Sequence, residues 1–378
     1  MPVEKVLVVG GGLAGMTLAT ALARTAVRAE IVEISPQWSA LGVGISLQGP
    51  TLRALKTLGA LDACVERGFG YSSVITCDAA GTVIGQVDLP RLNGPGYPAT
   101  LGILRPILNA ILIEGVKAAG VPVAFGVTVQ SIEHEADDVA VTLTDGSRGG
   151  YDLLVGADGA NSKMRELLFG PAARPEMTGQ AVWRATVPRP PEVRARYSFY
   201  GPRNKCGFNP VSEREMYVYL VENMSPERRL APYIPDEKLV AAMHEQLGDF
   251  GGLVAEAREY IQDPARIVYR PIGSLLLPAP WHRGRILLIG DAAHTPTPQL
   301  ASGAGMAIED AIVLAELVSR GLDAPALFDT FMSRRFARCR MVVENSRQLG
   351  EWEKTPGAPD ADPVGLMNRS FAALAEPI

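Results

Sequence analysis

The sequence predicts an α/β fold in which a domain with a parallel sheet is interleaved with a second domain built on a mostly antiparallel β-sheet. Two observations predict this class. Three short apolar runs, near the beginning, middle and end of the chain, are each followed by glycine, and the second and third also by an aspartate, which is typical of buried parallel strands that lead into helices. Between the second and third runs, short aromatic segments alternate with turn residues, which is typical of antiparallel strands.

The first apolar run, Val6 to Val9, leads into a glycine-rich turn. Gly10, Gly12 and Gly15 follow in the GxGxxG arrangement, and Met16 to Arg24 continue with the small and apolar residues of a helix. Such glycines allow a tight turn, a close approach of the backbone to a diphosphate, and close packing of the helix. The strand, turn and helix together predict a Rossmann-like dinucleotide site.

A second predicted strand, Ala29 to Ile34, carries an acidic residue near its end. Glu33 stands where a carboxylate accepts hydrogen bonds from ribose hydroxyls, and it is unsuited to a ribose 2′-phosphate. The dinucleotide is therefore expected to be FAD or NAD rather than NADP, with Leu13 and Ala14 in its binding loop. A chance glycine turn is the alternative, which the flanking strand and the acid disfavour.

Two β-rich regions lie farther along the chain. Residues Val127 to Leu143 alternate as a strand does and turn at Asp145 and Gly146, which predicts an antiparallel hairpin. From Ala181 to Val221, short aromatic segments predict a mostly antiparallel sheet, and Asp236 to Tyr260 have a helical pattern.

The middle of the chain repeats the order of strand, turn and helix. Tyr151 to Val155 form a short apolar run, Asp158 and Gly159 follow it, and Ser162 is placed to cap a helix over Lys163 to Leu168. A turn with a solvated aspartate is the alternative interpretation of this motif.

The last apolar run, Ile286 to Ile289, is followed by Asp291 at the carboxyl end of the strand, where ligands bind in sheets of this kind. After a Pro-rich loop, Gly303 and Gly305 remove side chains where backbone N–H groups approach a ligand. Ala304 begins a helix whose positive end points toward that ligand. Considered alone, the segment also fits an ordinary connection between a strand and a helix.

Together these motifs resemble one enzyme family. GGGLAG at the start, GADGANSKMR in the middle and GDAAH near the end occur in the order found in class A flavoprotein monooxygenases, the p-hydroxybenzoate hydroxylase-like family. The resemblance covers residues 3 to 345 and implies a GR2-type Rossmann-like domain with non-covalent FAD. It also implies NADH or NADPH as the co-substrate.

The chemistry of that family implies that NAD(P)H reduces FAD, that O2 adds at the flavin C4a position, and that the hydroperoxide transfers one oxygen atom to an aromatic ring. The expected partners are NAD(P)H, O2 and a small aromatic or heteroaromatic substrate, such as a phenol or hydroxy-acid. Two alternatives stay open. One is an FAD-dependent oxidoreductase that performs non-hydroxylating oxidation or oxidative decarboxylation, and the other is a flavin-binding module without catalysis.

The resemblance also implies roles for the motif residues. It implies that Glu33 holds the adenosine ribose and that Asp291 holds the ribityl chain. It places Asp158 and Gly159 where FAD and the nicotinamide cofactor meet.

Near the flavin ring, the resemblance places the amides of Ala304 and Gly305 at the N1 and O2 edge. Arg105 resembles the arginine that reaches the FAD backbone, although different residues follow it here, and a surface arginine is the alternative. Some relatives place arginines after the ribose-binding acid. This chain has Gly42 and Gly44 there, so its backbone is expected to face the cofactor.

The same resemblance implies four residues near the substrate. Lys205 and Tyr217 lie on neighbouring strands of the predicted sheet, and Pro298 and Gln299 face the flavin. A lysine supplies a point charge for a carboxylate or phenolate, and a tyrosine exchanges hydrogen bonds with a ring hydroxyl. A solvated turn residue is the alternative for Lys205. No obligatory catalytic base is evident from the sequence.

Composition excludes several other classes of protein. With 378 residues, 47% hydrophobic content and a net charge of −5, the chain has the composition of a large globular protein. No basic patch indicates a nucleic acid, and no segment predicts a membrane span. The histidines and cysteines show no metal spacing, so we expect no metal, no disulfide, and a cytoplasmic monomer or homodimer with four reduced thiols, Cys64, Cys77, Cys206 and Cys339.

The predicted domains are discontinuous. The FAD-binding domain comprises residues 1–72, 98–175 and 276–345, and the substrate domain comprises residues 73–97 and 176–275. Residues 346–378 form a C-terminal extension whose prolines indicate loose order.

Overall fold

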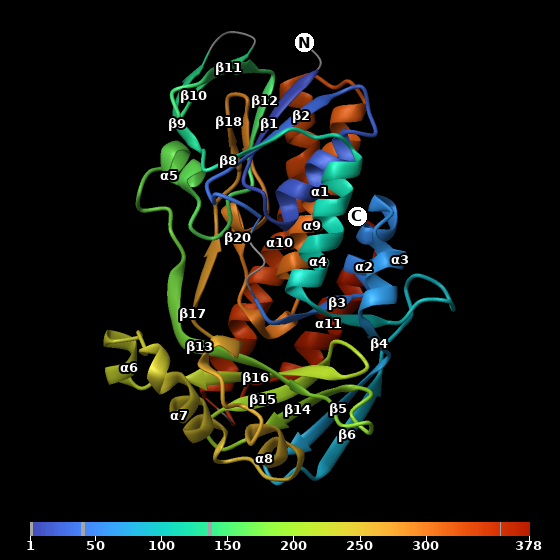
Figure 1. Cartoon of the computed structure of the whole chain (residues 1–378), viewed down its shortest axis with the longest axis vertical. Coiled ribbons are helices and arrows are strands. Elements are labelled where there is room, and N and C mark those ends of the chain that lie inside the picture. Colours follow the sequence, from blue (N-terminus) through green and yellow to red (C-terminus); the bar gives the residue numbers. More distant parts are fainter. Residues whose placement is uncertain (1–2, 39–41, 135–137, 356) are drawn as a thin grey trace.

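The computed structural model describes residues 3–38, 42–134, 138–355 and 357–378. A part built on a parallel sheet stands above a part built on an antiparallel sheet, and long helices near the C-terminus lie beside both (Figure 1). The predicted fold class is therefore confirmed.

The upper sheet has six strands in the described residues, and all of its pairs are parallel except the β18–β19 pair. In spatial order they are β18 (His282–Arg283), β19 (Ile286–Leu288), β12 (Leu153–Gly156), β1 (Lys5–Val9), β2 (Arg28–Glu33) and β8 (Val123–Phe125). The three predicted apolar runs therefore become the adjacent strands β1, β12 and β19, so their carboxyl ends meet at one edge of the sheet.

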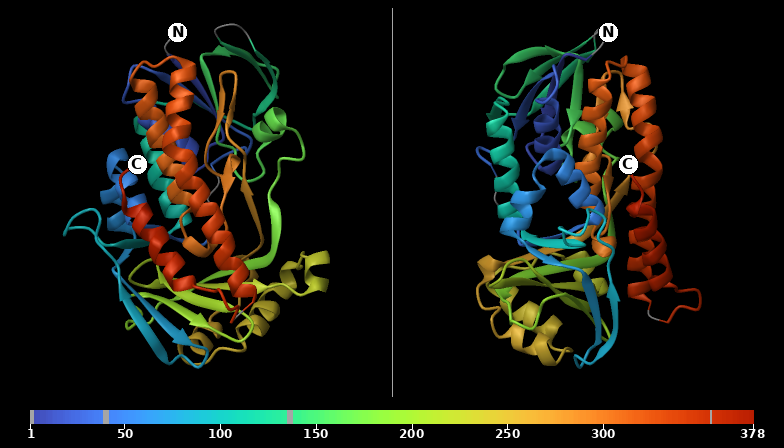
Figure 2. Two further views of the ribbon diagram at one scale, coloured as in Figure 1. Left: turned by 180° about the vertical axis from the view of Figure 1, so that it is seen from behind. Right: turned by 90° about the vertical axis from the view of Figure 1, so that its right-hand side faces the viewer.

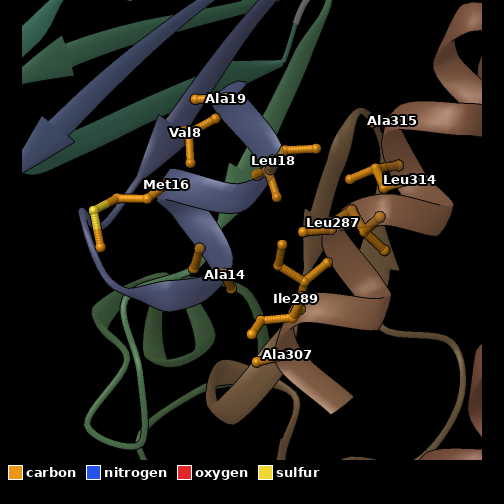
Figure 3. Close-up of a cluster of buried hydrophobic side chains, with 14 of the residues drawn as sticks. Val8, Ala14, Met16, Leu18, Ala19, Leu287, Ile289, Ala307, Leu314 and Ala315 are labelled. Atoms are coloured by element: carbon orange, nitrogen blue, oxygen red, sulfur yellow. The ribbon is translucent and has the colours of Figure 1, made fainter. Parts of the chain in front are cut away.

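Hydrophobic packing fixes the helices against this sheet. Figure 3 shows Leu18 and Ala14 of helix α1 (Leu13–Leu22) close to Leu287, Ile289 and Ala307, from the last motif and the helix that follows it. All five side chains are buried in the largest apolar core. The first and last motifs are thus packed on each other.

The lower sheet has eight strands, of which all neighbours are antiparallel except β14 and β5. In spatial order they are β20 (His294–Thr295), β17 (Ile267–Leu276), β13 (Glu176–Pro188), β16 (Glu215–Asn223), β15 (Lys205–Pro210), β14 (Arg196–Tyr200), β5 (Ser73–Asp78) and β6 (Val83–Asp88). Two three-stranded sheets complete the β-structure: β9 (Val129–His134), β10 (Val139–Leu143) and β11 (Arg148–Tyr151), and β3 (Gly44–Gln48), β7 (Thr100–Leu104) and β4 (Phe69–Tyr71).

Alternation along the lower sheet separates its two faces. One face carries Trp183, Phe208 and Val218, which pack in a second apolar core with helices α7 (Asp236–Leu247) and α8 (Gly252–Arg258). The opposite face, turned toward the upper part, carries polar residues such as Lys205 and Tyr217 at the intervening positions.

The helices cover both sheets. They are α2 (Gly49–Leu58), α3 (Leu61–Arg67), α4 (Arg105–Ala118), α5 (Lys163–Phe169), α6 (Pro226–Leu230), α7 (Asp236–Leu247), α8 (Gly252–Arg258), α9 (Gly303–Ser319), α10 (Ala324–Lys354) and α11 (Pro363–Ala375), with short 3-10 turns at Pro264–Arg266, Gly290–Ala292 and Pro298–Leu300. Helix α10 runs from the upper part down to the lower sheet, and α11 returns beside it (Figure 2). Among the described helices, none is long and apolar enough to cross a membrane.

Most of the predicted elements are confirmed. The turn at Asp145 and Gly146 joins β10 to β11, and the helical stretch from residue 236 to 260 is divided into α7 and α8. The expectation of a loosely ordered C-terminus is wrong. Residues 346–354 continue α10, and α11 buries Leu374 in the main core while Arg53 donates to the carbonyl oxygen of Ala375.

The docking of α11 gives a stability prediction. Leu374 is 1% exposed, so Leu374→Ala should lower the free energy of unfolding by about 2–5 kcal/mol, because it removes buried surface and leaves a cavity. The matched control is Val364→Ala on the same helix, where the side chain is 68% exposed and the expected change is within about 0.5 kcal/mol. Urea unfolding measures both, and equal midpoints would contradict a docked α11.

Candidate active site

The glycine motif forms a narrow turn between β1 and α1. Gly10 has φ +109°, and a Cβ there would lie 2.5 Å from the carbonyl oxygen of Ala157. A Cβ at Gly15 would overlap the carbonyl oxygen of Gly10, whereas nothing lies within 4 Å of the Cβ position at Gly12. The backbone at the start of α1 is therefore open to a ligand, as the diphosphate of a dinucleotide requires.

Glu33 lies at the edge of this turn. Its Oε2 accepts from Gly11 N–H at 2.7 Å, and its Oε1 accepts from Ser35 N–H at 2.8 Å. The carboxylate is thus fixed beside the glycine loop, and each of its oxygens can accept further hydrogen bonds.

The middle motif has a structural role that its sequence did not reveal. Asp158 accepts from Ser162 Oγ–H at 2.5 Å and from Met164 N–H at 3.0 Å, while Ser162 Oγ accepts from Arg165 N–H, so the predicted cap of α5 is confirmed. Gly159 has φ +79° with open space beside it. The buried Arg165 donates to the carbonyl oxygen of Ala292 at 3.1 Å, which ties the middle motif to the last one.

The last motif places Asp291 at the end of β19. Among the described residues no group donates a hydrogen bond to its carboxylate, and burial raises its pKa, partly offset by His294, Arg105 and Arg165. Because Asp291 is partly exposed and its carboxylate accepts no hydrogen bond from a described residue, it is available to a ligand hydroxyl, such as those of a ribityl chain.

Helix α9 begins next to this aspartate without a side-chain cap or an acid in its first turn, as α1 also does. Its N-terminal amides are therefore free to bind a polar edge of a ligand. Gly305 has a second role, because a Cβ there would overlap Thr51 Oγ1 on α2.

A buried carboxylate that the motif analysis overlooked holds this end together. Asp310 on α9 accepts from Gly290 N–H at 2.9 Å and Arg335 Nε–H at 2.7 Å, and its Oδ2 lies 2.6 Å from His294 Nε2. Burial raises the pKa of Asp310, but His294 and Arg335 outweigh it and lower the pKa to about 2. Burial likewise disfavours charged His294, but Cys339 and Asp310 raise its pKa well above the usual value.

The side chains of His294, Asp310 and Cys339 lie within 4.8 Å of one another, as metal ligands do. The guanidinium of Arg335 donates to Asp310 and lies 3.6 Å from Cys339 Sγ. This cation neutralises the carboxylate, so a salt-bridge network explains the grouping.

Gly44 has a packing role in the structure, while the expectation that its backbone faces the cofactor stays a prediction. A Cβ at Gly44 would overlap the ring of Tyr217, so the glycine lets β3 approach β16 across the interface between the two parts. Arg105 begins α4, and its side chain packs over Gly42 and lies close enough to Asp291 to lower that pKa.

Tyr217 belongs to a buried polar cluster. Its hydroxyl lies 3.4 Å from Ser46 Oγ, which donates to Asn209 Oδ1 at 2.9 Å, and Tyr71 donates to Ser46 at 3.0 Å. Burial raises the pKa of Tyr71 above its usual range, so this phenol remains protonated.

The structure does not bring Lys205 and Tyr217 together. Lys205 pairs with Val221 in the sheet, whereas Tyr217 pairs with Asn209, four positions farther along β15. Four residues of strand correspond to roughly 13 Å. Their shared contact with one substrate stays a prediction.

Lys205 lies instead in a pocket of about 260 Å³ between the lower sheet and the C-terminal helices. Its Nζ lies 3.0 Å from Glu353 Oε1, and Gln299 Nε2 donates to Glu353 Oε2 at 3.0 Å. Burial lowers the pKa of Lys205, but Glu353 outweighs it, so the pKa is raised. Pro298 begins the 3-10 turn that carries Gln299 to this pocket.

Two arginines on the same face of the sheet were also missed. Burial lowers the pKa of Arg184, which lies near Tyr217 and Arg105 and has no hydrogen bond or ion pair with any described residue. Burial also lowers the pKa of Arg196, but Tyr219 and Tyr71 outweigh this effect, so that the pKa of Arg196 is raised. These arginines alternate with apolar residues in β13 and β14, and this sequence pattern could have predicted that they lie on the polar face of the sheet.

The fold and site define an FAD-dependent flavoprotein. The open glycine turn, the unsatisfied Asp291 and two uncapped helix N-termini match the diphosphate, ribityl chain and polar ring edge of FAD. A family model described as "FAD binding domain" matches residues 4–346. The chain belongs to this family of FAD-dependent aromatic hydroxylases and monooxygenases.

Known relatives span nearly the whole chain. The 2-heptyl-3-hydroxy-4(1H)-quinolone synthase of Pseudomonas aeruginosa is 32% identical over 355 residues, which are 92% of this chain and 90% of the relative. The 3-hydroxybenzoate 6-hydroxylase of Polaromonas naphthalenivorans is 30% identical over 363 residues, with 91% and 87% covered. These matches favour an enzyme over a non-catalytic flavin-binding module.

A solved structure shares the fold. Klebsiella pneumoniae HpxO complexed with FAD and uric acid superposes with a TM-score of 0.84, at 23% identity, and the match covers 98% of this chain and 92% of HpxO.

The Asp310 network gives a pH-dependent prediction. Asp310→Asn should cost about 3–5 kcal/mol at pH 7, because it leaves Arg335 and His294 buried with fewer partners. The folded pKa is about 2, below the unfolded value near 3.9, so this stabilisation is complete above pH 4 and is lost as the pH falls toward 2. Urea unfolding across this range tests it against the exposed control Asp329→Asn. A difference that grows on acidification would refute the assignment.

The position of Asp291 gives a prediction about FAD retention. Asp291→Ala should weaken FAD binding by roughly 1.5–3 kcal/mol, because a hydrogen bond from a ribityl hydroxyl to a carboxylate is lost. Equilibrium dialysis with free FAD measures the dissociation constant, and circular dichroism monitors the fold. The exposed control Asp360→Ala should retain FAD. Equal affinity in both variants would remove Asp291 from the site.

Proposed function

We propose that this monooxygenase hydroxylates a small aromatic or heteroaromatic substrate bound between the Gln299 turn and the lower sheet. The observation that carries the proposal is the 260 Å³ pocket, because Gln299, next to the free N-terminus of α9, and Lys205, on the sheet, line it together. The relatives named as acting on a quinolone and a hydroxybenzoate support an aromatic ring. When bound, reduced FAD would supply the oxygen-transfer chemistry by reacting with O2. One oxygen atom goes to the aromatic ring and the other to water, and NADH or NADPH is oxidised.

The residues of this chain provide the environment. Trp352 and Leu349 on α10 and Met367 on α11 line the pocket with apolar surface against which an aromatic ring packs. The amides at the start of α9 and the unpaired Arg184 favour negative charge on reduced flavin. Pro298 and Gln299 hold the substrate against the flavin edge, and Tyr217 shares a hydrogen bond with Ser46, which in turn accepts from Tyr71.

We further propose that Glu33 binds the adenosine ribose, Arg105 the FAD backbone, and Asp158 with Gly159 the meeting point of the cofactors. Four free, buried cysteines support a reducing, cytoplasmic location. The chain is proposed to act as a monomer or homodimer.

A labelled-oxygen experiment tests the function. Purified holoprotein is mixed with NADH or NADPH and with phenols, hydroxybenzoates, hydroxypyridines and quinolones under ¹⁸O2. We expect at least one compound to accelerate NAD(P)H oxidation and to gain one labelled oxygen atom per turnover. An oxidised product without the label, or with loss of CO2 alone, would instead identify the non-hydroxylating oxidoreductase.

A further inference from the structure

The substrate pocket contains an ion pair whose net charge is zero. Lys205 and Glu353 are 11% and 16% exposed, and their charged atoms lie 3.0 Å apart. The other charged residue of the lining, Arg203, is 56% exposed and pairs with Asp249 at 2.8 Å. Among the described lining residues, every cation is therefore already paired with an anion of the chain.

Apart from Tyr200 and Trp352, the remaining polar side chains of the lining are amides. Gln299 Nε2 donates to Gln180 Oε1 at 3.1 Å as well as to Glu353, and Asn223 Nδ2 donates to the carbonyl oxygen of Glu353 at 3.1 Å. Gln299 Oε1 is buried and has no partner among the described residues. The accessible charged groups of the pocket are thus a balanced ion pair, and the unpaired Gln299 Oε1 lies buried in its wall.

We propose that Glu353 determines substrate specificity, so that the pocket selects an uncharged ring with neighbouring N–H or O–H and carbonyl groups over the corresponding aromatic carboxylate. This proposal rests on the proposed function. A keto oxygen accepts from the Lys205 ammonium without displacing Glu353, and a ring N–H or O–H donates to Glu353.

A carboxylate meets a different situation. To reach Lys205 it must displace Glu353, and the displaced anion is then left buried without a partner. If it does not displace Glu353, two like charges share a small pocket. The pocket therefore rejects the charged analogue through Glu353, whose negative charge repels a second carboxylate.

The test compares two probes of nearly the same size and shape, of which only one is charged: 4-oxo-1,4-dihydroquinoline-2-carboxamide, referred to below as the quinolone, and 4-hydroxyquinoline-2-carboxylate. Their dissociation constants are measured from the change in the FAD absorbance spectrum of the holoprotein. The wild type should bind the quinolone more tightly. Glu353→Gln leaves Lys205 unpaired, so the ratio of the two constants should shift at least tenfold toward the carboxylate.

Lys205→Met supplies an opposite arm, because it leaves Glu353 as an unpaired anion and should shift the ratio away from the carboxylate. A merely structural ion pair would shift both variants in the same direction, or neither. The control is Glu344→Gln, which removes the same charge from an exposed i,i+4 pair with Arg340 on α10 and should leave the ratio within twofold.

Ratios that match the control in both variants would overturn the proposal, and a variant that fails to retain FAD is judged by the other arm. The proposed function fails separately, when no probe or screened compound gains labelled oxygen. A shifted ratio without hydroxylation would leave the charge selection intact, and hydroxylation without a shifted ratio would refute only the role of Glu353.

Discussion

One buried carboxylate, Asp310, joins the segments on which the flavin end of the fold depends. It accepts from the backbone of Gly290 at the turn after β19, from His294 after that turn, and from Arg335 on α10. Since all of these groups are buried, each depends on the others for compensation of its desolvation. The position of Asp291, one residue beyond Gly290, is therefore set by contacts with side chains on α9 and α10, and the proposed ribityl site takes its geometry from this network.

Helix α10 extends that constraint to the substrate pocket. Its 31 residues correspond to about 47 Å, which is enough to pass from the upper core to the lower sheet. Arg335 near its middle binds Asp310, and Glu353 near its end binds Lys205 and Gln299. The same rigid element thus sets the flavin turn and one wall of the pocket, while α11 fixes it from outside through Arg338, which donates to the carbonyl oxygen of Leu374.

The side chains of the lower sheet alternate between an apolar face, which packs in the core, and a face that carries polar residues. Apolar residues such as Phe208 and Val218 face α7 and α8, and the intervening residues on the same strands face the cofactor side. Arg184, Arg196 and Tyr217 therefore occupy one face without disturbing the core on the other. This arrangement allows the substrate face to vary among relatives that retain the fold.

The sequence by itself determined the three strand–turn–helix motifs, the antiparallel character of the second sheet and the family. These features rest on periodicity and on glycine and capping residues within a few positions of one another, so they are readable locally. Only the tertiary structure decided that Gly44 makes room for Tyr217, that Arg165 links two motifs, and that the C-terminal segment is ordered. The partner of Lys205 lies 148 positions away on α10, and no local pattern specifies a contact whose two halves meet only when both sheets and the helix have packed.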